Sequence, residues 1–513
     1  MLYMPINRVI GASVIFITIL TGCSSLPKQA EHFDAPLTPK LTSALSTLND
    51  RHNPFITPQT PSAVLVQNTG WDALAQRLAL VEAAEHTIDI QYYIWNSDSS
   101  GRYLASRLVA AADRGVDVRV LLDDINLNDR EALLTKLDAH PNIEIRIFNP
   151  IPTRNAGKWI SFVGDFSRLN RRMHNKSFTV DGAFTVVGGR NIGDEYFDLS
   201  HELNLRDRDV LASGKVVVDV QHSFNDYWNS EWAYSVDLLR DKAKPLPQLM
   251  LSSIPVPEYR NYPALPQSQK AAITYLSALL KKMTGAKATY IADKPIPDDV
   301  DNTDQPKATA QYLSKLAKNT QNDIIIESAY LVFDDKQLAG LQQLSQKGVE
   351  IKALTNSMAS NDLVTNHSGY AGRRQDMLES GMDLYELKPD AKLCKIVIQD
   401  NDKCAPNAVY GLHAKSAVFD HQIATIGSFN FNLRSTYLNT ESLLVIENPK
   451  IATELATTLE GAMQDSNSWH LSLDDGDVYW HSGNEIWDSE PNTKQWDRMK
   501  SELLLLLPIE KYL

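Results

Sequence analysis

Apolar residues follow the same strand–helix–strand pattern at two places far apart in the chain. The first copy has a strand pattern, a helix pattern and a second strand pattern, at residues 88–93, 102–114 and 116–122. The second copy repeats this order, at residues 324–328, 336–347 and 349–354. Both helix patterns stop at a glycine, Gly115 or Gly348, and glycine is favoured where a helix ends in a left-handed residue. The pattern predicts two βαβ units with parallel strands.

A block of polar residues with fixed spacing follows each unit. It has a histidine, a lysine two residues later, an aspartate five residues after the lysine and an asparagine ten residues after the aspartate. In the first copy these residues are His174, Lys176, Asp181 and Asn191. In the second copy they are His413, Lys415, Asp420 and Asn430. A glutamate, Glu202 or Glu441, follows each histidine by 28 residues. This agreement indicates that the chain contains two copies of one unit.

The repeated block suits chemistry on a phosphate group. Alternate residues of a strand face the same way, so the histidine and the lysine of each block share a face. The Asp-Gly pair at 181–182 predicts a hairpin turn that returns residues 188–191 beside His174. A lysine charge and an asparagine amide suit the non-bridging oxygens of a phosphate. If the two halves bring their histidines together, one can attack phosphorus while the other moves the protons.

Each imidazole also needs a partner for its second nitrogen, and a carboxylate can hold it as in a Ser-His-Asp triad. The equal spacing makes Glu202 and Glu441 the candidates for this role. Asp181 and Asp420 lie at turns and are interpreted as structural supports.

Simpler interpretations compete with this one. A lone histidine on a strand is more often structural than catalytic, but the matched lysines, asparagines and glutamates favour a site. The two histidines and two glutamates could also bind a metal, which the neighbouring lysine charges disfavour. Gln91 and Glu327 occupy equivalent strand positions, where they either line the cleft or form a solvated strand edge.

The two HxK-x4-D-x6-G[GS]xN motifs resemble those of the phospholipase D superfamily, over most of residues 61–460. The resemblance implies an α/β fold of two homologous halves, each a mixed sheet flanked by helices, related by a pseudo-twofold around one active site. It also implies a phosphohistidine intermediate, with no metal and no cofactor. By the same resemblance His174 is the nucleophile and His413 the acid and base. The first copy has Gly189 where the second has Ser428, which removes a hydroxyl near the phosphate and bears on fine specificity.

The N-terminus reads as an export signal. Residues 9–22 are an apolar run after Arg8, short for a membrane span, which needs about 17–25 residues. The run ends at Cys23 in a sequence that resembles a bacterial lipobox, which implies lipid attachment at this cysteine. Ser24 is not the aspartate expected for inner-membrane retention, so a lipoprotein on the periplasmic face of the outer membrane is favoured. An uncleaved inner-membrane anchor is the alternative.

Export would expose the other cysteines to an oxidising compartment. Cys394 and Cys404 flank a strand-like segment at 395–400 and a polar turn. We predict a disulfide between them, with two independent buried thiols as the alternative.

The domain organisation follows from the repeat and from proline-rich stretches. We expect a signal, a stalk, a first half, a linker, a second half and a C-terminal extension, at residues 1–23, 24–60, 61–236, 237–268, 269–460 and 461–513.

Charge narrows the class of partner. The 513 residues include 50 basic and 63 acidic side chains, a net charge of −13, which speaks against a specific nucleic-acid partner. Residues 151–176 depart from this, with six basic residues against one acidic. Aromatic and apolar residues interleave with these charges, at Trp159, Phe162, Val163 and Phe166. The segment suits anionic lipid headgroups, or is a basic surface loop with its own small core. The leucines at 503–507 either dock on the protein's own core or contact a membrane.

Within the superfamily the lipobox-like signal, the lack of a pair of spanning helices and the tail at 507–510, Leu-Pro-Ile-Glu, most resemble type-C bacterial cardiolipin synthases. That resemblance implies phosphatidyl transfer onto phosphatidylglycerol from a second phospholipid, with membrane phospholipids as partners. The sequence identifies no protein partner. A phospholipase D-type hydrolase or nuclease is the first alternative, and an inactive lipid-binding lipoprotein the second.

Overall fold

The computed structural model describes residues 42–52, 54–127, 130–152, 165–243, 245–248, 253–296 and 305–505, together with residues 26 and 512. The N-terminal apolar run and Cys23 lie outside the described residues, as do Trp159, Phe162 and Val163. Within the described residues, no helix combines the length and apolar character needed to cross a membrane.

The first half of the chain forms a mixed sheet. Its strands are β1 Ser62–Gln67, β2 Thr87–Tyr92, β3 Asp117–Asp123, β4 Ile143–Phe148, β5 Ser177–Val180, β6 Phe184–Gly188, β8 Asp209–Gly214 and β9 Ala233–Ser235. They pair in the order β9, β4, β3, β2, β5, β6, β8, β1, with β2, β3 and β4 parallel and the others antiparallel.

The second half repeats this arrangement. Its strands are β10 Thr284–Ala292, β11 Asp323–Ser328, β12 Glu350–Asn356, β13 Met382–Leu387, β15 Lys415–Phe419, β16 Ile423–Gly427, β17 Ser442–Glu447, β18 Ser468–Asp474, β19 Asp477–Ser482 and β20 Glu485–Trp487. They pair in the order β10, β17, β16, β15, β11, β12, β13, β18, β19, β20.

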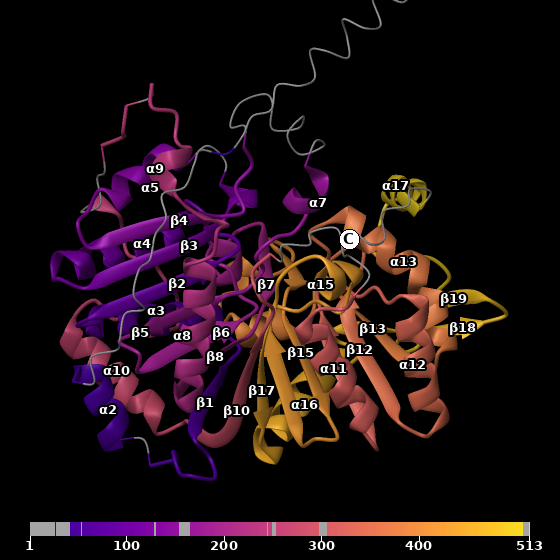
Figure 1. Ribbon diagram of the computed structural model, residues 1–513. Helices are drawn as coiled ribbons and strands as arrows, with labels where there is room; N and C mark the ends of the chain where they lie inside the picture. Colours follow the sequence, from indigo (N-terminus) through magenta and orange to yellow (C-terminus); the bar gives the residue numbers. More distant parts are fainter. Residues whose placement is uncertain are drawn as a thin grey trace, which may run out of the picture.

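The two sheets join edge to edge through β1 and β10, which pair antiparallel from Ser62–Ala286 to Val64–Thr284. From this junction outward, β1, β8 and β6 of the first half correspond to β10, β17 and β16 of the second half (Figure 1). This correspondence is what a pseudo-twofold axis between the halves requires. A second link is the parallel pairing of β7 Leu203–Arg206 with β14 Val409–Leu412. The structure therefore has the predicted α/β fold of two matching halves related by a pseudo-twofold.

Helices pack against this sheet (Figure 1). Those of the first half and of the segment after it are α2 Ala44–His52, α3 Gly70–Ala83, α4 Ser99–Asp113, α5 Glu131–Asp138, α7 Phe166–Leu169, α8 Lys215–Trp228, α9 Val236–Leu239 and α10 Gln269–Leu280. Those of the second half are α11 Ala308–Asn319, α12 Asp335–Gln346, α13 Val364–Glu379, α14 Leu393–Val397, α15 Leu433–Tyr437, α16 Pro449–Met463 and α17 Gln495–Leu505. Short 3₁₀ segments are Asp124–Asn126, Asp194–Tyr196 and Asn401–Lys403.

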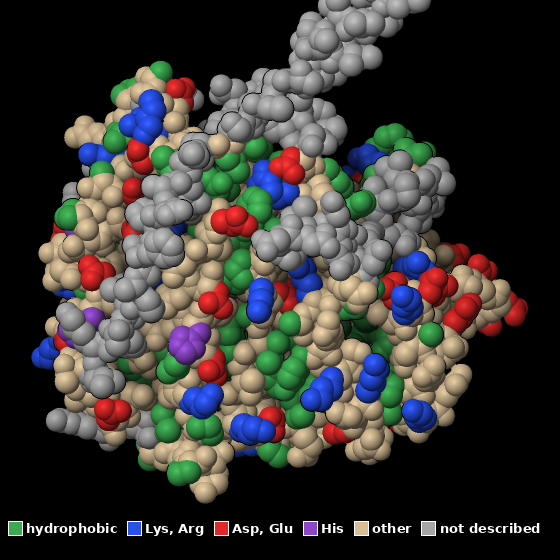
Figure 2. All heavy atoms as spheres, in the orientation of Figure 1, with side chains coloured by type: hydrophobic (Ala, Val, Ile, Leu, Met, Phe, Trp, Pro, Cys, Tyr) green, Lys and Arg blue, Asp and Glu red, His purple; other side chains and the backbone are tan. Residues whose placement is uncertain are grey.

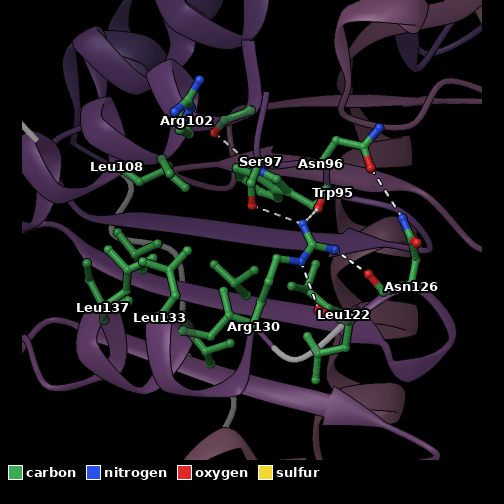
Figure 3. A pocket seen from close by; sticks show the side chains of 18 of the residues that line it. Trp95, Asn96, Ser97, Arg102, Leu108, Leu122, Asn126, Arg130, Leu133 and Leu137 are labelled. Carbon is green, nitrogen blue, oxygen red and sulfur yellow. Dashed lines mark hydrogen bonds between the residues drawn. The ribbon is translucent and has the colours of Figure 1, made fainter. Parts of the chain in front are cut away.

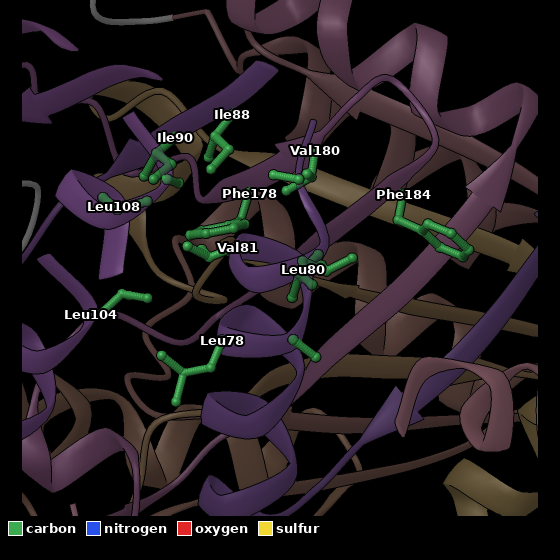
Figure 4. Packing of buried hydrophobic residues seen from close by; sticks show 14 of the residues in the cluster. Leu78, Leu80, Val81, Ile88, Ile90, Leu104, Leu108, Phe178, Val180 and Phe184 are labelled. Carbon is green, nitrogen blue, oxygen red and sulfur yellow. The ribbon is translucent and has the colours of Figure 1, made fainter. Parts of the chain in front are cut away.

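Strand alternation divides the core into layers. In β8, Leu211 packs in the cluster that holds α3, α4 and α10, whereas Val210 and Ala212 pack in the cluster that holds α8 and α16. Successive strand residues point to opposite faces, so one strand serves both clusters. Figure 4 shows the first cluster, with Leu78 of α3 and Phe178 of β5 among its members. The second cluster contains residues of both halves and so fixes how they meet.

The predicted βαβ units are confirmed, because β2 pairs parallel with β3 across α4, and β11 pairs parallel with β12 across α12. Gly115 and Gly348 follow these helices with φ of 93° and 91°, in the left-handed region that glycine favours. The predicted hairpins are also present, as β5–β6 and β15–β16.

Cys394 and Cys404 form a disulfide, with their Cα atoms 5.9 Å apart. The strand expected between them is wrong, since residues Leu393–Val397 form the helix α14. Six extended residues would span about 20 Å, whereas a helical turn keeps the two cysteines close.

The C-terminal extension adds β18, β19, β20 and the helix α17 to the second half. On α17, Trp496, Met499 and Leu503 have exposed fractions of 61%, 48% and 67%, and Figure 2 shows hydrophobic side chains on the surface there. Docking on the protein's own core is therefore wrong for Leu503. The leucines at 506–507 lie outside the described residues.

Candidate active site

The two histidine segments lie at the junction of the halves, each hydrogen-bonded to the backbone of the opposite half. The amide of His174 donates to the Thr440 carbonyl oxygen at 2.9 Å. The amide of His413 donates to the Arg206 carbonyl oxygen at 2.8 Å. Both histidines lie just before their strands, β5 and β15, rather than inside them as the alternation suggested. The pairing brings one histidine from each copy of the motif to the same junction.

Each imidazole is held by a carboxylate from the other half. Nδ1 of His174 lies 2.8 Å from Oε2 of Glu441, and Nδ1 of His413 lies 2.5 Å from Oδ2 of Asp207. Both carboxylates are fully buried. Glu441 therefore holds an imidazole, as predicted. That imidazole belongs to His174 of the first half.

The expectation for Glu202 is wrong. This residue is exposed, and its backbone oxygen accepts a hydrogen bond from the Val409 amide at the β7–β14 edge. Asp207 takes the place that equal spacing assigned to Glu202. The first copy has five more residues between histidine and carboxylate than the second, 33 against 28, so counting from the histidine reaches the wrong acid.

Strand register identifies Asp207 where spacing fails. Gly188 at the end of β6 pairs with Asp209, and Gly427 at the end of β16 pairs with Leu443. Two residues before these partners stand Asp207 and Glu441, so the two carboxylates are equivalent in the sheet.

Further hydrogen bonds fix the two carboxylates. Glu441 accepts from the hydroxyl of Ser428 at 2.5 Å and from that of Ser435 at 2.7 Å. Asp207 accepts from the Arg208 amide at 2.7 Å through its other oxygen, Oδ1. A Cβ on Gly189 would lie 2.6 Å from that same Oδ1. The difference between Gly189 and Ser428 therefore reflects the carboxylate that each faces, not a hydroxyl offered to substrate.

A lysine and a tyrosine accompany each histidine. Nζ of Lys176 donates to the His174 carbonyl oxygen at 2.6 Å, and Lys415 donates in the same way to His413. The ring of Tyr93 meets that of His174 edge-on at 4.9 Å between centroids, and Tyr196 meets His413 at 5.1 Å. Each histidine thus has its own lysine and its own tyrosine, although both tyrosines belong to the first half.

Burial sets the protonation of these groups. Desolvation lowers the pKa of His174 to about 4 and that of His413 to about 3, outweighing the attraction of their carboxylates. It also lowers the pKa of Lys176 to about 7 and that of Lys415 to about 8. Both imidazoles are therefore neutral at pH 7. A neutral imidazole that donates Nδ1–H to a carboxylate leaves a lone pair on Nε2, which can act as a nucleophile or a base.

The motif asparagines lie beside these groups. Oδ1 of Asn191 accepts from the Ile94 amide at 3.3 Å. Oδ1 of Asn430 is buried and accepts no hydrogen bond from the residues that the structure describes. Amide nitrogen and oxygen can exchange places at such a site, so Asn430 can offer a donor to an anionic ligand.

Asp181 and Asp420 act as structural supports, as expected. Asp181 accepts from the amides of His86 and Thr87 at 2.8 and 2.9 Å, just where β2 begins. Asp420 accepts in the same way at the start of β11, from the Asn322 amide at 2.6 Å.

Gln91 and Glu327 are buried, so the solvated-edge interpretation is wrong for both. Glu327 pairs with Arg206 at 2.7 Å and with Arg208, both from the first half. A carboxylate with no exposed surface needs such partners, and here they tie the two halves together behind the site.

The described arginines of the basic segment before His174 do not lie on the surface as expected. Arg168, Arg171 and Arg172 are buried, and Arg172 pairs with the fully buried Asp123 at 3.1 Å. Arg154 and Lys158 lie outside the described residues. The described arginines of this segment serve the fold instead of attracting lipid.

Comparisons with known proteins agree with this architecture. A family model described as "Cardiolipin synthase, PLD-like domain" matches residues 78–228 and 313–463. The chain is 40% identical over 461 residues to cardiolipin synthase C of Escherichia coli (strain K12), covering 86% of this chain and 93% of that protein. It is 24% identical over 392 residues to cardiolipin synthase 1 of Bacillus cereus, covering 76% of this chain and 64% of that protein.

Among solved structures, phosphatidylserine synthase from Haemophilus influenzae Rd KW20 superposes with a TM-score of 0.55 at 13% identity, covering 91% of this chain and all of that one. This likeness shows the fold. The family match and the 40% identity show more: the chain belongs to the cardiolipin synthase family and is an enzyme of the phospholipase D superfamily.

Proposed function

We propose that this enzyme is a phosphatidyltransferase that makes cardiolipin from phosphatidylglycerol and a second phospholipid, through a phosphohistidine intermediate. The observation that carries the proposal is the pair of buried, neutral histidines, each held at Nδ1 by a carboxylate of the opposite half. The name of the relative with 40% identity supports the choice of product.

In the first step, Nε2 of His174 attacks the phosphorus of the phosphatidyl donor. The new P–N bond replaces the bond from phosphorus to the headgroup oxygen, and His413 gives that oxygen the proton that its Nε2 takes from water when the substrate binds. The negative phosphate raises the proton affinity of His413 when substrate binds, which offsets the effect of burial.

In the second step, His413 takes the proton from a hydroxyl of phosphatidylglycerol. The resulting oxygen attacks phosphorus, a P–O bond forms, and the P–N bond to His174 breaks. Each proton taken up in one step is returned in the other, so the enzyme ends as it began. Lys176, Lys415, Asn191 and Asn430 stabilise the phosphate oxygens in both steps.

In this mechanism Lys176 and Lys415 of the active site, and not the arginines of the basic segment, bind the anionic headgroup. Lys176 and Lys415 are buried, so their charges are screened little by salt. We also propose that residues 1–23 export the protein and that a lipid on Cys23 anchors it on the periplasmic side. The outer membrane is favoured, with the inner membrane as the alternative.

Product analysis tests the proposal. The purified protein is supplied with phosphatidylglycerol alone, or with phosphatidylethanolamine added, and cardiolipin is separated from phosphatidic acid. Cardiolipin as the main product supports phosphatidyl transfer. Mainly phosphatidic acid indicates a hydrolase and contradicts the proposal, and no turnover of any phosphodiester indicates a lipid-binding protein without activity.

Three variants complete the experiment. We expect His174→Ala and His413→Ala each to abolish turnover while the thermal unfolding temperature stays close to that of the parent protein. His222→Ala is the matched control, because His222 is exposed on α8 and away from the site. Activity retained in either site variant would contradict a shared two-histidine site.

A further inference from the structure

An apolar cavity lies in the first half, between the strands β3 and β4 and the helices α4 and α5 (Figure 3). The space between its walls that holds no atoms is about 790 Å³ when the open solvent at its mouth is counted, and the fully accessible interior is about 80 Å³. Most of its lining is aliphatic, and the aliphatic side chains from the strands and both helices include Leu108, Val120, Leu133, Leu137 and Ile145.

The side chains of α5 do not fill the cavity between this helix and the sheet. Beneath it, Val120 and Ile145 of the sheet are buried, but Leu133, Leu134 and Leu137 of α5 are only half-buried. Protein interiors are normally close-packed, and an unfilled apolar space costs stability. An apolar ligand in this space would complete the packing of all three leucines.

The cavity reaches the candidate active site. Tyr93 and Asp123 both line it. The ring of Tyr93 contacts His174 at 4.9 Å between centroids, and Asp123 accepts a hydrogen bond at 2.9 Å from the amide of Met173, the residue before that histidine. One side chain therefore separates the cavity from the proposed nucleophile.

The two ends of the cavity differ in polarity. Figure 3 places Trp95, Asn96 and Asn126 at one end, and Leu108 and Leu137 at the other. Toward the polar end, the guanidinium of Arg130 is held by backbone carbonyl oxygens, among them that of Leu127 at 2.8 Å. A fixed charge at one end and aliphatic walls at the other match a molecule with a polar head and a hydrocarbon tail.

We propose that this cavity binds one acyl chain of the phosphatidyl group while its phosphorus is transferred at His174. The proposal rests on the proposed function in one respect, that the substrate is a phospholipid. The proposal places the acyl chain of the lipid in the space between α4 and α5, and not on the exposed apolar residues of α17.

Filling the cavity tests the proposal. Ala105 of α4 is half-buried and lines the cavity, so Ala105→Phe places a ring where the chain would lie. Ala110→Phe is the matched control, since Ala110 lies on the same helix, is equally half-buried and does not line the cavity. Unfolding temperatures of both variants verify that they fold.

The readout is the KM for phosphatidylglycerol with 16-carbon chains, measured as lipid consumed, and compared with the KM for 8-carbon chains. Each methylene moved from water into an apolar site changes affinity about fourfold, so losing a few of them raises KM at least tenfold. We expect this rise for Ala105→Phe with the long chains, a much smaller rise with the short chains, and neither in Ala110→Phe. Equal effects of the two substitutions, or no dependence on chain length, would overturn the proposal.

A photoreactive lipid separates this inference from the proposed function. Phosphatidylglycerol with a diazirine near the end of one chain is cross-linked to the full-length protein, and the labelled peptides are mapped. Labels within residues 99–138, lost in Ala105→Phe and kept in Ala110→Phe, support the cavity. Labels only on α13 or α17 contradict it. Because cross-linking needs no turnover, a protein that hydrolyses its lipid would fail the proposed function and still pass this test.

Discussion

The contact between Asp207 and His413 offers the sharpest test of how the site works. In Asp207→Asn the side chain keeps its size, but its amide can donate a hydrogen bond to Nδ1 in place of accepting one. His413 would then lose the partner that stabilises its protonated form. We expect this imidazole to become a poor acid, although it stays in place.

The magnitude follows from the geometry. The 2.5 Å contact joins two side chains with exposed fractions of 7% and 0%, so it is a buried, charge-assisted hydrogen bond. Such a bond contributes about 1.5–3 kcal/mol, which corresponds to roughly a 10- to 150-fold change in rate. Holding the wrong tautomer adds to this, and the same change in a Ser-His-Asp triad lowers kcat about 10⁴-fold. We therefore expect kcat to fall between about 10² and 10⁴-fold, with a much smaller change in KM.

The assay measures lipid consumed per enzyme at saturating phosphatidylglycerol, for Asp207→Asn and for Glu202→Gln. Glu202 is the acid that sequence spacing favours, but it is exposed and away from the imidazole. Its variant should retain full activity. If Asp207→Asn stayed within about threefold of the parent protein, or Glu202→Gln were equally damaged, the assignment of the carboxylate would be wrong.

Three further predictions concern the charge, packing and stability of the chain. Burial lowers the pKa values of the site lysines Lys176 and Lys415 to about 7 and 8, so these lysines lose their positive charge as pH rises. Because that charge binds the lipid phosphate, the KM for lipid should increase roughly tenfold between pH 6.5 and 9. A KM that does not change with pH would contradict this. Gly189→Ser should lower kcat at least about tenfold, because its Cβ would lie 2.6 Å from Oδ1 of Asp207, whereas Gly461→Ser, with nothing within 4 Å, should not. Replacing both Cys394 and Cys404 by alanine should lower the free energy of unfolding of the oxidised protein by about 3 kcal/mol in a denaturant titration, and an unchanged midpoint would indicate that the bond does not form in solution.

The repeat made much of this fold predictable. Matching hydrophobic patterns gave the two βαβ units, and the Asp-Gly turn at 181–182 together with the repeat gave the hairpin after each histidine. Glu441 was identified from the 28-residue spacing that it shares with Glu202, although Asp207 is its equivalent in the sheet. These features depend on local sequence, which hydrophobic periodicity and turn chemistry describe well.

Asp207 was missed because its position depends on pairing between strands. Five extra residues in the first copy shift the carboxylate away from equal spacing, while the register of β6 with β8 keeps it in the same place. Aligning the strand pattern from Asp209 with that from Leu443 would have pointed to the residue two positions earlier, which is Asp207 in the first copy and Glu441 in the second.

The basic segment was misinterpreted for a different reason. A run of arginines has the same sequence signature whether the charges face water or buried acids. Arg172 pairs with Asp123, which lies 49 residues earlier in the chain, and only the fold brings the two together. Burial of charge therefore could not be predicted from the composition of the segment.

Trapping the intermediate tests the central claim, that one site uses a histidine of each half in a different role. A phosphatidyl donor with a nitrophenol leaving group needs no acid, so it can load His174 in the His413→Ala variant, where no base remains to release it. Mass spectrometry should find the phosphatidyl group on the peptide that contains His174, and on no peptide of the His174→Ala variant. An adduct that persists in His174→Ala, or the absence of any adduct in His413→Ala, would contradict the account.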